Sequence, residues 1–295
     1  METGRDPRGT GTDARGRRVL VTGASRGIGR AIALALADAG FDVAISARTG
    51  RRGQGVHSAY ERALPGSLEE TAAQIDARGQ RSLALPCDLT DVAAVEAAVA
   101  ELIETWGGAD VVINNGRYIG PGLMEPLLGT DLQDYRRFVE AHAIAPIRVA
   151  QLLLPGMLER GGGTFVTVSS SQATDYYPDR APRDGKSGLG YRLGKTAGHM
   201  LAGALLAEHG EQGIRAFNVN PGLVITERNA PDLAKNGYDA GSAAPPAAIG
   251  AVVAWLVTSA EADSLMRQDN HAQPLALERG LHPDWNGTGV GGPRT

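Results

Sequence analysis

The sequence predicts an α/β fold, with one domain built on a Rossmann-type, doubly wound parallel sheet flanked by helices. Short runs rich in β-branched residues alternate with longer alanine- and leucine-rich patterns along most of the 295 residues, which is typical of βαβ units. Several short runs are continuously apolar, as in 111–113, which is expected of strands covered by helices on both faces. A glycine-rich turn follows the first run and opens a helical pattern.

The predicted elements follow one another in a regular order. The strand candidates lie at 18–22, 42–46, 82–87, 111–114, 164–169 and 215–220. The helical patterns lie at 28–39, 68–77, 92–106, 134–154, 191–209 and 247–258. We therefore expect a single domain over 17–276, between a flexible leader at 1–16 and a C-terminal tail at 277–295.

Two segments are longer than the connections of a compact α/β domain require. Residues 49–66 form an arginine-rich insertion after the second strand, which we interpret as a solvated surface loop. Residues 173–190 are rich in proline, aspartate and glycine. This second segment is a candidate substrate lid, because it lies between two residues that we assign to catalysis below; a solvated loop is the alternative.

Composition argues against several classes of protein. The chain is 42% hydrophobic, which is ample for a buried core. Its net charge of −4 argues against a nucleic-acid partner, since such binding needs a basic surface. Cys87 is the only cysteine, so no intrachain disulfide can form and a reducing compartment is expected. No apolar run of membrane-span length and no secretory signal is apparent, so we expect a soluble cytoplasmic protein with no membrane partner and no metal.

The glycine-rich turn at 22–29 has the features of a phosphate-binding cradle. Its glycines let the backbone approach a phosphate closely, and the following helix offers free N–H groups and a positive dipole end. Ordinary strand-to-helix turns are also glycine-rich, but a second strand ending about 20 residues later favours a dinucleotide site. The residues assigned to this cradle are Gly23, Ser25, Arg26, Gly27, Ile28 and Gly29.

The end of the second strand favours NADP(H) over NAD(H). An acidic residue at this position accepts hydrogen bonds from a free ribose 2′-hydroxyl, whereas an arginine attracts a 2′-phosphate. The sequence has no acid at 46–48 and offers Arg48, with Arg26 as a second cation. The alternative is that Arg48 is only a solvated strand end.

Six motifs, in order, resemble those of the short-chain dehydrogenase/reductase family. They are Thr-Gly-x-x-x-Gly-x-Gly at 22–29, an aspartate after the third strand at 88, Asn-Asn-Gly-Arg at 114–117, Ser-Ser at 169–170, Tyr-x-x-x-Lys at 191–195, and Asn-Pro-Gly with a following threonine at 220–226. The resemblance covers roughly 17–260 and implies a nicotinamide cofactor. The further cofactor contacts that it implies are Asp88, Leu89, Asn115, Tyr191, Lys195, Pro221, Gly222, Val224 and Thr226.

Ser170, Tyr191 and Lys195 match the catalytic positions of the family, and their chemistry fits carbonyl reduction. Tyrosine is a poor acid at neutral pH because its ordinary pKa is about 10. Tyr191 lies four residues before Lys195 on one predicted helix, so the ammonium can stabilise the phenolate and lower this pKa. Ser170 would donate a hydrogen bond to the carbonyl oxygen as charge develops.

The sequence departs from the family pattern at several positions. His142 stands where the family has an asparagine whose main-chain carbonyl serves a proton relay, so His142 is a candidate catalytic residue or a packed helical histidine. Arg117 replaces a small residue beside the cofactor site, and 266–269 lacks the family's glycine. The interval from Ser170 to Tyr191, 191 − 170 = 21 residues, is longer than in most members. These departures suggest an unusual substrate.

We therefore predict an NADP(H)-dependent ketoreductase or alcohol dehydrogenase that acts on a small-molecule carbonyl or alcohol, with Tyr191 as acid and base. A non-redox enzyme of the same fold, such as a dehydratase or cyclase, and an NADP(H)-binding regulator without turnover are the alternatives. The family resemblance further implies a homodimer or homotetramer.

Overall fold

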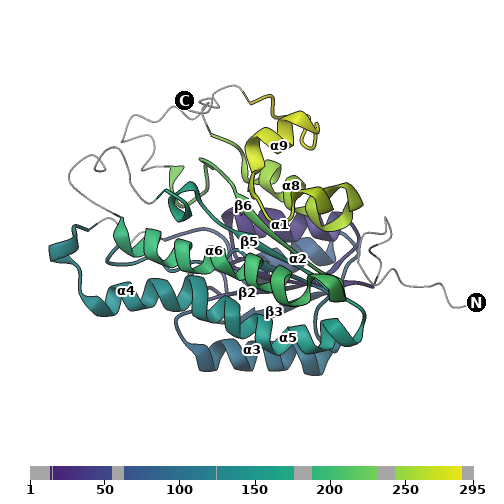
Figure 1. Ribbon diagram of the computed structural model, residues 1–295, viewed down its shortest axis with the longest axis horizontal. Coiled ribbons are helices and arrows are strands. Elements are labelled where there is room, and N and C mark those ends of the chain that lie inside the picture. The colour runs from purple at the N-terminus through teal and green to yellow at the C-terminus, as the bar shows by residue number, and fades with distance from the viewer. Residues whose placement is uncertain are drawn as a thin grey trace, which may run out of the picture.

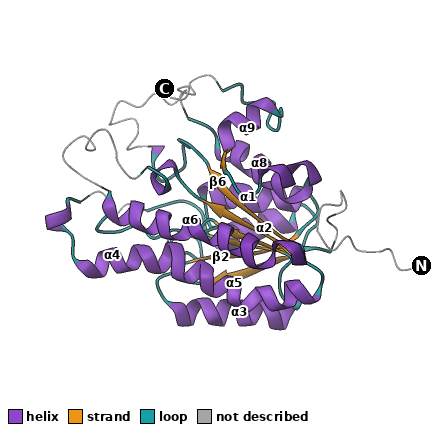
Figure 2. Ribbon diagram, in the orientation of Figure 1, coloured by secondary structure: helices purple, strands orange, loops and turns teal. Residues whose placement is uncertain are grey.

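The fold is built on one sheet of seven parallel strands, in the order β3-β2-β1-β4-β5-β6-β7 (Figures 1 and 2). The computed structural model describes residues 14, 16–54, 63–123, 125–175, 188–230 and 243–287. The strands are β1 (Arg18–Thr22), β2 (Asp42–Ala47), β3 (Ser82–Pro86), β4 (Val111–Asn114), β5 (Gly163–Val168), β6 (Ile214–Asn220) and β7 (Asp269–His271). The chain winds outward from β1 in both directions, which confirms the predicted doubly wound fold class.

Helices cover both faces of this sheet (Figure 1). One face carries α1 (Gly27–Asp38), α2 (Leu68–Asp76), α8 (Pro246–Thr258) and α9 (Ala272–Glu278). The other face carries α3 (Val92–Trp106), α4 (Leu132–Val139), α5 (Ala145–Glu159) and α6 (Leu189–His209). Short 3₁₀ turns lie at Leu127–Gly129, Ser171–Ala173, Gly210–Gln212 and Ala260–Leu265.

The central strands are mainly apolar because helices bury both faces of the sheet there. Val19 and Val21 join the core on the α1 side, whereas Leu20 between them joins the core on the α3 side. Val112 and Phe165 extend the second core in the same way. Successive side chains of a strand point to opposite faces, so a strand covered twice needs an apolar residue at every position.

The last strand and helix were not predicted. β7 has the sequence Asp-Asn-His, with no apolar alternation to signal a strand. It is held at the sheet edge by parallel pairing with β6 and by the side chain of Asn270, which donates to the carbonyls of Asn218 and Leu265. Side-chain hydrogen bonds, rather than apolar contacts, therefore hold β7 at the edge of the sheet.

The helix expected at 134–154 is wrong in its bounds and its regularity. The structure has α4, then a π-helical turn over Glu140–Ile144, then α5, which continues through Pro155 to Glu159. Pro146 has no N–H group and cannot bond the carbonyl four residues earlier, that of His142. A π-turn at this place is consistent with that missing bond, and it makes room for one extra residue.

The helical run 132–159 passes a length and composition test for a membrane span, although no such segment was expected. Its most apolar 18-residue window has a mean hydropathy of 1.3, and half of that window is buried inside the protein. The run packs against α3 and α6, as a core helix does. A buried core helix can pass the same length and composition test as a membrane span.

Parts of the expected leader, insertion, lid and tail lie outside the described residues, namely 1–13, 15, 55–62, 176–187 and 288–295. In the described parts of the insertion, residues 51–54 are exposed, as expected of a solvated loop, whereas the end at 64–66 packs against the fold. Leu64 is only 4% exposed, and the carbonyls of Pro65 and Gly66 accept hydrogen bonds from the Arg26 guanidinium. In the tail, Leu281 and Trp285 pack against the core on the α8 side.

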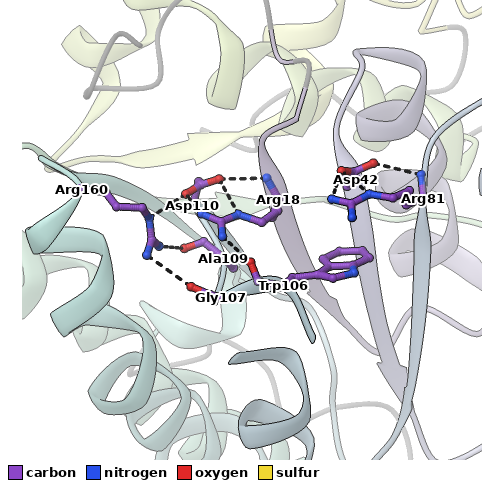
Figure 3. Close-up of polar contacts among 8 residues, drawn as sticks. All are labelled: Arg18, Asp42, Arg81, Trp106, Gly107, Ala109, Asp110 and Arg160. Atoms are coloured by element: carbon purple, nitrogen blue, oxygen red, sulfur yellow. Dashed lines mark hydrogen bonds and ion pairs between the residues drawn. The ribbon is translucent and has the colours of Figure 1, made fainter. Parts of the chain in front are cut away.

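A cluster of charges ties the amino ends of the central strands together (Figure 3). Arg18, which opens β1, donates from its backbone N–H and its guanidinium to the carboxylate of Asp110, just before β4. Arg160, after α5, donates to the same carboxylate at 3.1 Å. Burial raises the pKa of Asp110, but hydrogen bonds from Arg18 and the charges of both arginines outweigh it, so the pKa lies below its usual value.

We expect Asp110→Asn to lower the free energy of unfolding by about 2 kcal/mol at pH 7, because hydrogen bonds to a charged group are lost. The folded-state pKa is lowered, so this contribution is fully present above the unfolded value of about 3.9 and is lost as pH falls through the folded value. Urea unfolding at pH 7 and pH 3 measures both effects. Glu104→Gln, at an exposed carboxylate of α3, is the control and should change little. An equal effect of Asp110→Asn at both pH values would contradict the assignment.

Candidate active site

A cradle of glycine backbone lies between the carboxyl end of β1 and the start of α1. Gly23 and Gly27 have φ angles of +69° and +56°, in the left-handed region that favours glycine. A Cβ on Gly29 would lie 2.2 Å from the Gly23 carbonyl oxygen, so only glycine fits there. The Asn115 side chain donates to the Thr22 carbonyl at 2.9 Å and fixes the turn from the β4 side.

A carboxylate of the protein already lies on the N-terminus of α1. The backbone N–H of Gly27 donates to Glu227 Oε2 at 3.1 Å, and Arg30 forms an ion pair with the other oxygen. The Glu227 oxygen stands in for an anionic oxygen of a phosphate, since both accept from helix N-terminal amides. The cradle therefore fits the pyrophosphate of a dinucleotide cofactor.

The cavity continues from the cradle to the end of β2, where Arg48 is exposed. Arg26 donates to the carbonyls of Pro65 and Gly66, which holds its guanidinium near the same end of the cavity. A neighbouring cavity that shares Arg48 is lined by Asp88 and Leu89, from the segment that follows β3. Arg26 and Arg48 thus lie at the end of the cavity where the sequence predicts the 2′-phosphate of the cofactor ribose.

The opposite end of the cavity is lined by Ser170, Tyr191 and Lys195. Ser170 follows β5, while Tyr191 and Lys195 lie one turn apart on α6 and share one face of it. Lys195 is 7% exposed, and its Nζ donates to the Val168 carbonyl at 2.6 Å. Nζ lies 5.8 Å from the centre of the Tyr191 ring. Strand β5 therefore positions both the serine and the lysine.

This arrangement makes the Tyr191 phenol a stronger acid. Burial raises the pKa of Tyr191, but the positive charges of Lys195 and Arg117, together with hydrogen bonds to Ser170 and Arg117, outweigh it and lower the pKa below its usual value. Burial also lowers the pKa of the Lys195 ammonium, an effect that the Tyr191 phenolate opposes and Arg117 reinforces. A proton can therefore leave or return to the Tyr191 oxygen more readily than in water.

A family model of the short chain dehydrogenases matches residues 17–237 of this sequence. The chain belongs to the short-chain dehydrogenase/reductase family. A fatty acyl-CoA reductase of Mycobacterium tuberculosis is 32% identical over 253 residues, which are 84% of this chain and 74% of the relative.

Solved structures of the same family superpose on this short-chain dehydrogenase/reductase. One is a short-chain type dehydrogenase/reductase from Mycobacterium marinum, with a TM-score of 0.71, 26% identity, and coverage of 88% of this chain and 95% of that one. Another is L-sorbose reductase from Gluconobacter frateurii, solved with NADPH and L-sorbose, with a TM-score of 0.70, 25% identity, and coverage of 89% and 96%. The chain is therefore an oxidoreductase of the class that interconverts alcohols and carbonyls.

Most of the residues that the sequence singled out line one cavity of about 410 Å³ in this short-chain dehydrogenase/reductase. They are Gly23, Ser25, Arg26, Gly27, Ile28, Gly29, Arg48, Asn115, Ser170, Tyr191, Lys195, Pro221, Gly222, Val224 and Thr226. Asp88 and Leu89 line the neighbouring cavity, and His142 lines neither. Within the described part of the chain, no group of three or more His, Cys, Asp or Glu side chains gathers as a metal site requires.

His142 lies in the π-turn behind the Tyr191 ring, at a ring-centre distance of 5.7 Å. Burial, with the charges of Lys195 and Arg117, lowers its pKa well below the usual value, so the imidazole is neutral. Its Nε2 accepts from the backbone N–H of Tyr118 at 3.2 Å, which assigns the ring proton to Nδ1. The structure thus gives His142 a defined packing role beside the phenol.

Sequence reasoning missed a hydrogen-bonded group at Ser169, the residue before Ser170. Ser169 Oγ lies 2.8 Å from His199 Nδ1, and His199 Nε2 lies 2.8 Å from Asp269 Oδ1 on β7. The four-residue spacing from Lys195 to His199 was the available signal, because it puts both on the same face of α6. Ser169 is 4% exposed, so this chain of contacts anchors the end of β5 next to Ser170.

Proposed function

We propose that the chain is an NADP(H)-dependent ketoreductase or alcohol dehydrogenase, with Tyr191 as the acid in reduction and the base in oxidation. The observation that carries this proposal is the Tyr191 phenol itself. A hydrogen bond with Ser170 and the positive charge of Lys195 both lower its pKa. It lines the same cavity as the glycine cradle. A pKa lowered in this way is what a general acid and base needs near neutral pH.

The proposed mechanism assigns one task to each residue. The nicotinamide cofactor supplies or accepts the hydride when it is bound. The Ser170 hydroxyl donates a hydrogen bond to the substrate oxygen, and Tyr191 gives that oxygen a proton as negative charge develops on it. Lys195 stabilises the phenolate that remains, held in place by its bond to the Val168 carbonyl.

The preference for NADP(H) is supported by the charges at the far end of the cavity. Arg48 is exposed at the end of β2, Arg26 lines the same cavity, and no acidic side chain lies at 46–48. A 2′-phosphate adds two negative charges that a guanidinium can bind through paired N–H groups. The L-sorbose reductase with which this chain superposes was solved with NADPH.

Two measurements test the proposed function. NADPH and NADH are titrated into the protein, and NADPH consumption is then followed at 340 nm with a panel of ketones. Tighter binding of NADPH and its consumption by at least one ketone are expected. Product formation without NADPH consumption would favour the dehydratase or cyclase alternative, and NADPH binding without any turnover would favour a regulator.

We expect Arg48→Ser to weaken NADPH binding by about 10- to 100-fold and to leave NADH binding nearly unchanged. The loss corresponds to about 1.5 to 3 kcal/mol for hydrogen bonds to a charged phosphate. Titration of both nucleotides into wild type and variant measures the effect. Arg51→Ser removes an equal charge from an exposed position outside the cavity and is the control. Equal weakening of both nucleotides would contradict a 2′-phosphate contact.

A further inference from the structure

The cavity that holds the catalytic residues is strongly positive. Its charged lining residues are Arg26, Arg48, Arg117, Lys195 and Arg228, and none of its described lining residues is acidic. Arg26 and Arg48 lie toward the end assigned to the ribose phosphate, and Lys195 acts on Tyr191. Arg117 helps to lower the pKa of Tyr191 and also lines the neighbouring cavity with Asp88 and Leu89, but no ligand has yet been assigned to its guanidinium.

Arg117 lies at the reacting end of the cavity. It lines the same cavity as Ser170 and Tyr191, and its positive charge helps to lower the pKa of Tyr191. Its charge also lowers the pKa values of Lys195 and His142. Arg117 is nevertheless exposed, so part of the guanidinium faces the open cavity.

The backbone before Arg117 is held in one position. The N–H of Gly116 donates to Thr22 Oγ1 at 2.9 Å, and the Asn115 side chain donates to the Thr22 carbonyl. Gly116 has no side chain, and its Cα lies so close to Leu89 that an added Cβ would be 2.4 Å from a Leu89 methyl carbon. Arg117 is thus the first residue after the fixed turn that carries a side chain with room to enter the cavity.

No carboxylate among the described residues forms an ion pair with Arg117. The other arginines of the fold commonly do, as Arg18 does with Asp110 and Arg215 with Asp263. A guanidinium has five N–H donors in a planar fork that matches the two oxygens of a carboxylate. The Arg117 guanidinium lines the cavity, so its donors can face such a ligand.

We propose that Arg117 binds the carboxylate of the substrate, so that the enzyme reduces oxo acids and oxidises hydroxy acids. This proposal rests on the proposed function and names its substrate class. Arg117 and Tyr191 line the same cavity, so one small substrate can present its carboxylate to Arg117 and its carbonyl to Tyr191. The carbonyl carbon gains the hydride of NADPH, its oxygen gains the Tyr191 proton, and the carboxylate is unchanged.

The test compares each oxo acid with its methyl ester, which keeps the carbonyl and removes the charge. The pairs are pyruvate, acetoacetate and 2-oxohexanoate against their methyl esters, with wild type, Arg117→Met and Arg117→Lys. We expect wild type to prefer the acids in kcat/KM by about 10- to 100-fold, as loss of a charge-assisted fork predicts. Arg117→Met loses the preference, and Arg117→Lys keeps part of it because a point charge remains.

The ratio of acid to ester separates substrate binding from the other effects of Arg117. A change in the Tyr191 pKa alters both members of a pair alike and leaves their ratio constant. Arg136→Met, at an exposed arginine of α4 outside the cavity, is the matched control and should keep the wild-type ratio. Binding of NADPH to Arg117→Met, measured by titration, should stay within about twofold of wild type.

Three results would overturn this inference. In one, wild type reduces acids and esters equally, or it reduces simple ketones and none of the acids. The proposed function then stands, but carboxylate binding by Arg117 does not. In another, Arg117→Met keeps the acid preference. In the third, Arg117→Met weakens NADPH binding tenfold or more with an unchanged ratio, which would make Arg117 a cofactor ligand. If wild type binds no NADPH and reduces no ketone, acid or ester, the proposed function itself fails.

Discussion

Tyr191→Phe is expected to lower kcat for ketone reduction by about 10²- to 10⁴-fold, the usual contribution of a positioned general acid. The variant removes only the phenol oxygen, which carries the transferred proton and contacts Ser170 and Arg117. The ring, its contact with His142 and the rest of α6 stay in place. Single-turnover reduction with NADPH in excess measures the step directly, and the Kd for NADPH should change little.

Tyr135→Phe is the control for that variant. Tyr135 is 8% exposed on α4, and its hydroxyl has no hydrogen-bond partner among the described residues. Removing that hydroxyl leaves no donor or acceptor unpaired, so activity should remain within about twofold. Retention of most activity by Tyr191→Phe would remove the phenol from the mechanism and leave Ser170 or a water as the proton donor.

The fold could be predicted where burial dictates residue type. β1, β2 and β4 are covered by helices on both faces, so their sequences are mainly apolar and composition indicates where they lie. β7 could not be predicted, because side-chain bonds of Asn270 and pairing with β6 hold a strand of three polar residues. The π-turn at Glu140–Ile144 also escaped prediction, since a helical periodicity does not reveal which carbonyl lacks a partner.

The candidate site could be predicted where spacing along one element decides the geometry. Tyr191 and Lys195 share a face of α6 because they are four residues apart, and the glycine turn opens α1 because it follows β1. Arg117 at the end of β4 and Tyr191 on α6 line one cavity because of the sheet order, which no local pattern contains. The same holds for Glu227 on the Gly27 amide, which bridges distant segments of the chain.

Lys195→Met is expected to move the pH profile of alcohol oxidation to higher pH and to lower the rate at pH 7 by about 10²-fold or more. Oxidation needs the phenolate, so its rate rises as pH passes through the pKa of Tyr191. Among the charges, Lys195 is the larger of the two that lower this pKa, whereas burial raises it. Without the ammonium, burial moves the pKa upward, and less phenolate exists at neutral pH.

The size of the shift in the pH profile distinguishes the effect of Lys195 from that of Arg117. Arg117→Met removes the smaller of the two charges and should shift the profile in the same direction by less. Burial lowers the pKa of Lys195, so a methionine of similar length removes a destabilising buried cation. The same variant removes the donor to the Val168 carbonyl, so its two effects on the melting temperature oppose each other. A profile that stays in place in Lys195→Met while the rate falls would mean that the observed titration belongs to another group. Lys195 would then act through the cofactor or the Val168 carbonyl rather than through the phenol.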